Sequence, residues 1–267
     1  MNQDKAGTAY WEQLWAKDPV VSPHPSIAYR DRRIRSFLAN IFKDFKGRGA
    51  RLLEVGCGST SSLPFVAGEF GFRLTGIDYS PKACEQARAN LMRHGIAGEI
   101  VCADFLQPPE NLKDSFDVVF SAGVVEHFTD TAESLRSLTG FLKDGGLMIT
   151  TIPNLTGLGG LIQRTFNRPI FEVHVPLDRM ALRTAHEQAG LEVVSCEYFM
   201  SSNFGMINLE GATSLFAKRI VLALLTRLSH AIWILEDLMR PISPNKFTSP
   251  YVICVARKRG KISSSQS

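Results

Sequence analysis

The chain has 267 residues, 45 % of them hydrophobic, and a formal net charge of +4 at pH 7. This length and composition are ordinary for a globular protein, and they allow one large domain or a domain with an insertion. The charge comes from basic residues near the C-terminus, namely Arg257, Lys258, Arg259 and Lys261. The rest of the chain is close to neutral, which argues against nucleic acid as the main partner.

The cysteines are five in number and spread along the chain, and no two of them have metal-site spacing. Because the count is odd, we expect reduced thiols rather than a disulfide framework. The stretch from Met1 to Ala9 is polar and lacks the apolar core of a signal peptide. Both features predict a cytoplasmic protein.

Residues 1–50 precede the first predicted strand. The segment from Tyr10 to Trp15 has room for one or two helical turns, and three prolines then form an irregular link. From Ile27 to Phe45 the apolar residues recur at helical spacing. We therefore expect a helical N-terminal segment.

A buried strand followed by a glycine turn organises the chain. Leu52 to Val55 form the expected strand, and the turn Gly56-Cys57-Gly58 contains two residues without a Cβ atom, so a ligand can approach its backbone. The polar residues 59–62 supply N-cap candidates for a helix whose N–H groups point above the turn. A second strand, 73–77, ends at Asp78, where an acid is placed to hydrogen-bond the hydroxyls of a ribose. The pattern predicts a nucleoside-containing ligand.

The same loop differs from a dinucleotide-binding fingerprint. The third glycine of that fingerprint is missing after Gly58, which weakens a pyrophosphate interpretation. Glu54 precedes the turn, and an acid there repels phosphates but suits an ammonium or sulfonium group. An acid inside an apolar strand also needs a partner.

Strands and helices then alternate as in a parallel sheet. The expected helices cover 62–70, Pro81 to His94, Thr131 to Leu142 and Asp178 to Ala189, and the further strands are 99–102, 117–121, 147–152, 191–199 and 251–256. The segment 154–176 is too apolar for a linker and lies where a strand delivers the chain to the ligand side.

Residues 200–250 have a strongly apolar centre between the last two strands. From Ser214 to Met239 the apolar residues lie on nearly every side of a helix, more than one buried face needs. Charged residues interrupt this stretch, so it is not expected to span a membrane. Three interpretations remain open: a lid over an apolar substrate pocket, a homodimer surface, or a patch that rests on a membrane.

Four segments in order resemble the motifs of class I S-adenosylmethionine-dependent methyltransferases. They are Leu-Leu-Glu-Val-Gly-Cys-Gly at 52–58, Gly-Ile-Asp-Tyr-Ser at 76–80, Cys-Ala-Asp-Phe-Leu at 102–106 and Phe-Asp-Val-Val-Phe-Ser-Ala-Gly-Val-Val-Glu-His-Phe at 116–128. The resemblance is to small-molecule enzymes related to the ubiquinone-biosynthesis methyltransferases. It implies an α/β, Rossmann-like fold with a seven-stranded, mainly parallel sheet of order 3-2-1-4-5-7-6, a reversed last strand and helices on both faces. A methyltransferase domain over 51–258, with an insertion at about 200–250 and a disordered tail at 259–267, would follow the N-terminal segment 1–50.

The resemblance also implies the cofactor, S-adenosyl-L-methionine, with S-adenosyl-L-homocysteine as product. Gly56 and Gly58 would approach the methionine part, and Glu54 would support it electrostatically. Asp78 would bind the ribose, and Tyr79 would pack on the adenine. The remaining implied contacts are Asp104 with the adenine amino group, the Phe105 backbone beside it, and the carbonyl of Ser121 with the methionine ammonium. The N-terminal helices would cover this site, with Tyr10, Trp11, Tyr29 and Arg30 as lid candidates.

On the acceptor side, His127 and His174 are the candidate catalytic bases, because histidine exchanges protons near neutral pH. His24 is a weaker candidate, His186 is expected in solvent, and no metal site is expected. By analogy with the subgroup, the acceptor is a small organic molecule methylated on a hydroxyl or carboxyl oxygen. Methylation of nitrogen or carbon in a natural product or lipid-like acceptor is an alternative, and so is a non-catalytic protein that binds the cofactor. A nicotinamide oxidoreductase is disfavoured, because it would need the third glycine and hydride-site groups that we do not find.

Overall fold

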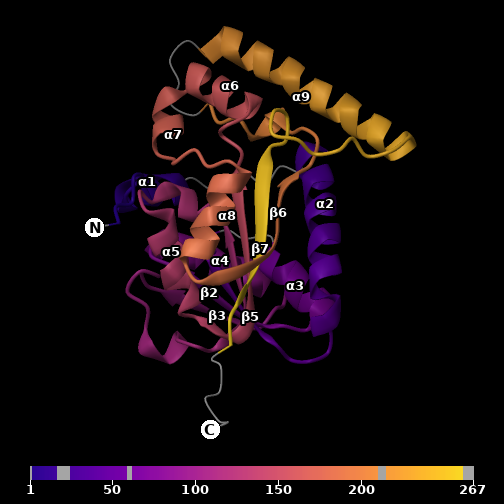
Figure 1. Ribbon diagram of the computed structural model, residues 1–267. Coiled ribbons are helices and arrows are strands. Elements are labelled where there is room, and N and C mark those ends of the chain that lie inside the picture. Colours follow the sequence, from indigo (N-terminus) through magenta and orange to yellow (C-terminus); the bar gives the residue numbers. More distant parts are fainter. Residues whose placement is uncertain (1, 17–24, 59–61, 210–214, 261–267) are drawn as a thin grey trace.

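The computed structural model describes residues 2–16, 25–58, 62–209 and 215–260 (Figure 1). Its seven strands form one sheet of order β3-β2-β1-β4-β5-β7-β6, which confirms the expected topology. The strands are β1 (Arg51–Val55), β2 (Arg73–Asp78), β3 (Gly98–Cys102), β4 (Phe116–Ala122), β5 (Leu142–Pro153), β6 (Leu191–Phe199) and β7 (Tyr251–Lys258). β7 pairs antiparallel with both β5 and β6, while β1 to β5 are parallel.

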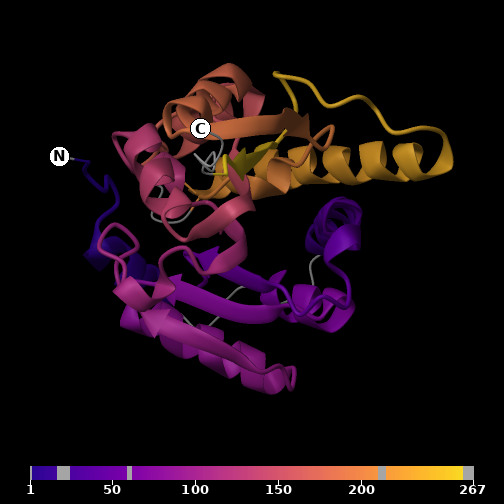
Figure 2. The ribbon, with the colours of Figure 1, turned by 60° about the horizontal axis from the view of Figure 1, so that its bottom comes forward.

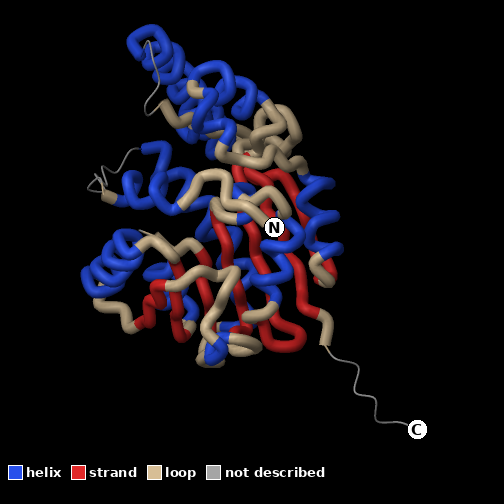
Figure 3. Tube along the Cα trace, turned by 90° about the vertical axis from the view of Figure 1, so that its left-hand side faces the viewer, coloured by secondary structure: helices blue, strands red, loops and turns tan. Residues whose placement is uncertain are grey.

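Helices cover both faces of the sheet (Figures 1 and 3). They are α1 (Thr8–Trp15), α2 (Pro25–Phe42), α3 (Ser62–Phe70), α4 (Pro81–Arg93), α5 (Thr131–Thr139), α6 (Leu158–Phe166), α7 (Arg168–Glu172), α8 (Arg179–Gln188) and α9 (Leu215–Leu238). Short 3₁₀ turns are η1 (Lys43–Phe45), η2 (Glu110–Leu112), η3 (Val125–His127) and η4 (Phe204–Met206).

The central strands are apolar on both sides because both of their faces are buried. In β1, Leu53 and Val55 belong to the hydrophobic cluster under α5 and α8, whereas Leu52 belongs to the cluster under α2, α3 and α4. Each fully buried Leu or Val side chain contributes about 1.5–3 kcal/mol to the stability of the fold. The alternation along β1 therefore anchors the glycine turn that follows it between two packed layers.

The chain leaves β1 toward β2 and β3 on one side, and it returns to β4 on the other side. The carboxyl ends of β1 and β4 consequently form a topological switch point, where open α/β sheets bind ligands. This is the place that the glycine turn 56–58 occupies.

The structure corrects several expectations about local structure. α5 ends at Thr139, three residues before the predicted end, and Leu142 already pairs with Phe116 as part of β5. His186 was predicted in solvent, which is wrong: it is fully buried, and its Nε2 lies 3.0 Å from the Thr150 hydroxyl. It shares the inner face of α8 with Leu182.

Two of the C-terminal basic residues are part of the sheet rather than of a free tail. Arg257 donates a hydrogen bond to the carbonyl of Gly145, and Lys258 binds the carboxylate of Asp114. Most of the predicted disordered tail, residues 261–267, lies outside the described residues, so the boundary at 259 stays a prediction.

Residues between β6 and β7 include the long helix α9, which lies across one end of the molecule together with α6 and α7 (Figures 1 and 3). Among the residues that the structure describes, no helix is both long and apolar enough to cross a membrane.

Candidate cofactor and acceptor site

A cavity of about 350 Å³ lies at the switch point, over the carboxyl ends of β1, β2 and β4. This volume falls in the range of about 300–1,000 Å³ that is typical of small-molecule sites. The wall consists of Asp4, Trp11, Leu14, Trp15, Glu54, Gly56, Cys57, Gly58, Ile77, Asp78, Tyr79, Ala103, Phe105, Ala122, Gly123, Val124, His127 and Phe128.

The two glycines of the turn are required by geometry. Gly56 has φ +69°, and a Cβ atom there would lie 2.4 Å from Cγ2 of Val124. Gly58 has φ +28°, and its Cβ would lie 2.5 Å from Cζ2 of Trp15. Side chains at either position would therefore strain the backbone and collide with the cavity wall.

Asp78 connects the ribose position to the glycine turn. Its carboxylate accepts hydrogen bonds from the backbone N–H groups of Gly58 (3.2 Å) and Ser80 (2.9 Å). Burial raises its pKa above the usual value for Asp, against the lowering effect of these two N–H groups. An acid placed in this way both holds the turn and presents its remaining lone pairs to a ligand that lies on the turn.

Glu54 and Tyr79 also line the cavity. The carboxylate of Glu54 is buried in β1 and lines the cavity. The hydroxyl of Tyr79 donates a hydrogen bond to Asp4 Oδ2 at 2.7 Å, which fixes its ring against the cavity.

Asp104 does not lie in the cavity wall, in contrast to Phe105. Its exposed carboxylate accepts a hydrogen bond from the N–H of Leu106 at 2.9 Å, which is the geometry of a turn residue. Phe105 is buried and packs edge-on against Phe128, with ring centroids 5.2 Å apart. The adenine contact of Asp104 remains a prediction without support from this geometry.

Ser121 is fully buried within β4 and does not line the cavity. The strand continues to Ala122, one residue further than predicted, so Ala122 and Gly123 face the cavity instead. The sequence pattern missed this shift because Ala122 continues the apolar run and carries no polar signal.

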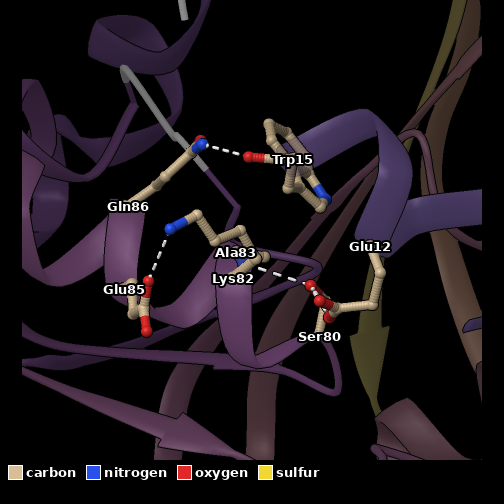
Figure 4. Close-up of polar contacts among 7 residues, drawn as sticks. All are labelled: Glu12, Trp15, Ser80, Lys82, Ala83, Glu85 and Gln86. Carbon is tan, nitrogen blue, oxygen red and sulfur yellow. Dashed lines mark hydrogen bonds and ion pairs between the residues drawn. The ribbon is translucent and has the colours of Figure 1, made fainter. Parts of the chain in front are cut away.

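The N-terminal segment closes the cavity from outside. Glu12 on α1 accepts a hydrogen bond from the Ser80 hydroxyl at 2.5 Å, and the carbonyl of Trp15 accepts one from Gln86 on α4 at 2.5 Å (Figure 4). These contacts hold Trp11 and Trp15 in the wall.

Of the four lid candidates, Trp11 alone lines this cavity. Tyr10 packs edge-on against Trp11, whereas Tyr29 stacks on Trp233 of α9. Arg30 lines a different cavity, described below. His24 lies outside the described residues.

His127 at the end of η3 and His174 after α7 lie side by side although they are far apart in the sequence. Their ring centroids lie 4.4 Å apart, and Trp11 packs edge-on against His127 at 4.9 Å. The Nδ1 atom of His127 lies 2.9 Å from the carbonyl oxygen of Val173, and Nδ1 of His174 lies 2.7 Å from that of Ile170. In each neutral ring Nδ1 therefore donates to the carbonyl, and Nε2 is the acceptor.

Burial keeps both imidazoles neutral. Desolvation is the largest cause that lowers the pKa of His127, to about 4, and repulsion between the two rings, were both protonated, is the next. Desolvation also lowers the pKa of His174. The adjacent Glu126 is completely buried, its carboxylate oxygens have no hydrogen-bond partner among the residues that the structure describes, and burial raises its pKa to about 8. Glu126 is therefore protonated at neutral pH.

Ligand atoms of Glu126, His127 and His174 lie within 4.8 Å of one another. Such a set of side chains also occurs in metal sites, and the expectation of no metal site did not foresee it. Both histidines were candidates from the sequence, but their proximity to the Glu126 carboxylate depends on the tertiary fold and has no sequence signal.

A second cavity of about 250 Å³ adjoins the first and shares Ala122 and Gly123 with it. Its other residues come from α2, α3 and the ends of β5 and β7, and they are Arg30, Asp31, Ile34, Arg35, Leu38, Phe65, Thr151, Ile152, Pro153 and Tyr251. Arg30 is held by an ion pair with Asp31 at 3.1 Å. Most of these residues were missed, because a lone arginine on an amphipathic helix is no signal by itself.

Comparisons with known proteins agree with this geometry. Residues 53–150 match the family described as "Methyltransferase domain". The chain is 32 % identical over 155 residues to the ubiquinone biosynthesis O-methyltransferase of Pelagibacter ubique. This match covers 54 % of this chain and 61 % of that protein. It is 35 % identical over 123 residues to the enzyme of the same name from Caulobacter sp. strain K31. That match covers 45 % of this chain and 48 % of the relative. The matches thus span about half to three-fifths of these relatives.

Among solved structures, geranyl diphosphate C-methyltransferase from Streptomyces coelicolor, in complex with S-adenosyl-L-homocysteine, has the same fold. The TM-score is 0.57 at 17 % identity, and the match covers 92 % of this chain and 87 % of that one. The residues of the cavity fit the same cofactor, since the glycine turn lets it approach and an acid ends β2. Residues 53–150 therefore match a methyltransferase domain, and the chain shares its fold with an S-adenosyl-L-homocysteine-bound methyltransferase.

Proposed function

We propose that the protein transfers a methyl group from S-adenosyl-L-methionine to a small organic acceptor, on a hydroxyl or carboxyl oxygen. The observation that supports this most directly is the junction of the two cavities at Ala122 and Gly123. A cofactor in the first cavity and an acceptor in the second would meet at this junction. The two relatives described above are O-methyltransferases by name, which favours oxygen over nitrogen or carbon.

In this proposal the chain binds the cofactor through its first cavity. Asp78 binds the ribose, Tyr79 packs on the adenine, and Glu54 balances the positive charge of the methionine part. S-adenosyl-L-methionine supplies an electrophilic methyl group on a cationic sulfur. Trp11 and Trp15 exclude water from the reacting centre, because they form the outer wall of the cavity.

His127 is the proposed acceptor of the hydroxyl proton. Its Nδ1–H is directed to the carbonyl of Val173, so Nε2 has a free lone pair when the ring is neutral. A pKa of about 4 keeps the ring neutral but makes it a weak base. General-base catalysis adds about 10²–10⁴-fold, and we place His127 at the lower end of that range. Most of the acceleration would then come from alignment.

The second cavity sets the expected acceptor chemistry. Its apolar residues include Ile34, Leu38 and Phe65, and its guanidinium groups belong to Arg30 and Arg35. An acceptor with an apolar ring or chain and one anionic group would fit this lining. We also infer a cytoplasmic location, which the free cysteines of the described residues support.

The test combines calorimetry with turnover. The protein is titrated with S-adenosyl-L-methionine, S-adenosyl-L-homocysteine and NAD, and it is then incubated with phenols, catechols, hydroquinones and aromatic carboxylic acids. Mass spectrometry of the products locates the methyl group. Binding of both sulfur compounds but not NAD, followed by an oxygen-methylated product, is the expected result. Methylated nitrogen or carbon would replace the oxygen assignment, and binding without turnover on any acceptor would support the non-catalytic alternative.

A further inference from the structure

The side of α9 that faces away from the protein is apolar and exposed. Its exposed fractions range from 42 % at Val221 to 80 % at Phe216. We call this surface the outer face of α9, and its members are Phe216, Ile220, Val221, Leu224, Leu228, Ile234, Leu235 and Leu238. Soluble monomers rarely expose contiguous apolar patches larger than a few hundred Å², so a patch along a 24-residue helix calls for an occupant.

The helix cannot turn this face inward, because its opposite side is fixed. Trp233 is 3 % exposed, stacks on Tyr29 of α2 with ring centroids 4.5 Å apart, and donates its Nε1–H to the carbonyl of Ser202. Glu236 accepts a hydrogen bond from the Tyr29 hydroxyl at 2.6 Å. The Ser229 hydroxyl accepts one from the N–H of Phe204 at 3.0 Å.

The position of α9 does not support a lid over either cavity. No described residue of α9 lines either of the two cavities. Figure 1 shows α9 lying across the end of the molecule, and Figure 2 shows its C-terminal part extending outward above α2. The outer face of α9 is thus directed away from the two cavities.

Basic residues outnumber acidic ones among the exposed residues on and just after α9. Arg219, Arg227 and Arg240 are exposed, and so is Lys246 in the segment that follows α9. The described part of 215–247 has two acids, and both are bound: Glu236 to Tyr29, and Asp237 to Arg32 at 2.7 Å. An apolar strip accompanied by exposed arginines is complementary to a surface that is apolar inside and anionic outside.

A second copy of the chain fits this face less well. Arg227 lies near the middle of Leu215–Leu238 and is exposed. A two-fold axis through the centre of the helix would bring two Arg227 side chains together, although interface cores are depleted of charge.

We propose that the outer face of α9 docks the protein on an anionic phospholipid surface. The helix lies in the plane of the interface, its apolar side chains enter the acyl boundary, and Arg219, Arg227 and Arg240 contact the phosphates. A patch of this kind needs no span, and its length of 24 residues is common among interfacial helices. The proposal is independent of the methyl-transfer reaction.

The experiment measures co-sedimentation of the full chain with vesicles. One set contains phosphatidylcholine and phosphatidylglycerol in equal parts, and the other contains phosphatidylcholine alone. The test variant is Leu224→Glu/Leu235→Glu, at positions that are 57 % and 52 % exposed, so folding is expected to be unaffected. The matched control is Met92→Glu on α4, where the side chain is 79 % exposed. Circular dichroism checks the helix content of all variants.

Wild type and Met92→Glu are expected to bind the anionic vesicles, less so at high salt, and to bind pure phosphatidylcholine weakly. The double variant is expected to lose about tenfold or more in partitioning, since each buried methylene contributes about 0.8 kcal/mol. Arg227→Glu is expected to weaken binding to the anionic vesicles specifically. The proposal would be overturned if wild type bound neither kind of vesicle, or if the double variant bound the anionic vesicles as well as Met92→Glu does. If sedimentation velocity shows a dimer for wild type and Met92→Glu but a monomer for the double variant, the face is assigned to contact with a second copy instead.

Discussion

Replacing Asp78 by alanine is expected to weaken binding of S-adenosyl-L-homocysteine and, separately, to lower the stability of the unliganded protein. Removal of a charged acceptor from ligand hydroxyls costs about 1–3 kcal/mol, which corresponds to about 5–150-fold in Kd. The same change also removes the acceptor of two backbone N–H groups, those of Gly58 and Ser80. A buried donor left without an acceptor costs about 1–3 kcal/mol in the free energy of unfolding.

The two effects are separated by a second substitution and by two assays. Asp78→Asn keeps one carbonyl oxygen, so it is expected to retain more of the stability than Asp78→Ala while still losing affinity. Isothermal calorimetry gives the Kd, and thermal unfolding without ligand gives the stability. Glu85→Ala, an exposed carboxylate on the neighbouring α4, is the control and is expected to change neither. An unchanged Kd in Asp78→Ala would refute the ribose assignment.

Three further predictions concern the acceptor side. His127→Ala is expected to lower turnover by up to about 10²-fold with nearly unchanged cofactor affinity, and a larger loss in His174→Ala, measured by kcat and Kd, would transfer the role of base to His174. Burial raises the pKa of Glu126 from 4.5 to about 8, so the native state holds a proton that the unfolded state releases, and the contribution of Glu126 to stability is lost as pH rises through this window. Glu126→Gln should therefore flatten the decline in unfolding free energy between pH 4.5 and about 8, as followed by denaturant titration, and an equally steep decline in the variant would contradict the assignment. Because no ion is expected at Glu126, His127 and His174, chelator treatment should leave turnover unchanged, whereas a loss restored by a divalent cation would make this cluster a metal site.

The parallel half of the fold was predictable because each of its strands is a short apolar run that ends in a turn signal. The apolar run from Leu52 to Val55 indicates a buried strand, and Gly56 and Gly58 after it indicate a turn that a ligand can approach closely. The position of Asp78 in the cavity wall was predictable for the same reason, since an acid directly after an apolar strand has few structural uses, and its contact with a ribose stays a prediction. The antiparallel position of β7 came from the family resemblance and not from the residue pattern.

The expectations that the structure corrects or leaves without support have a common physical origin, which is that a side chain is placed by its tertiary neighbours. Asp104 matches its motif position, yet its carboxylate binds the N–H of Leu106 and faces solvent. His186 looks polar in sequence, yet its two nitrogens find partners inside the fold, so its burial is tolerated. The second cavity forms between α2 and strand ends that are far apart in sequence, and periodicity carries no information about such meetings.

The last two strands pair along their full length, and Phe199 lies directly opposite Tyr251. Residues 200–250 therefore leave the sheet and rejoin it at neighbouring points, so the sheet sets no requirement on the length of the segment between them. The free energy of closing such a loop changes only slowly with its length, by about 0.6 kcal/mol per doubling. Segments of other lengths can therefore join the same strand pair without a change in the sheet, provided that they replace the contacts that α9 makes with α2.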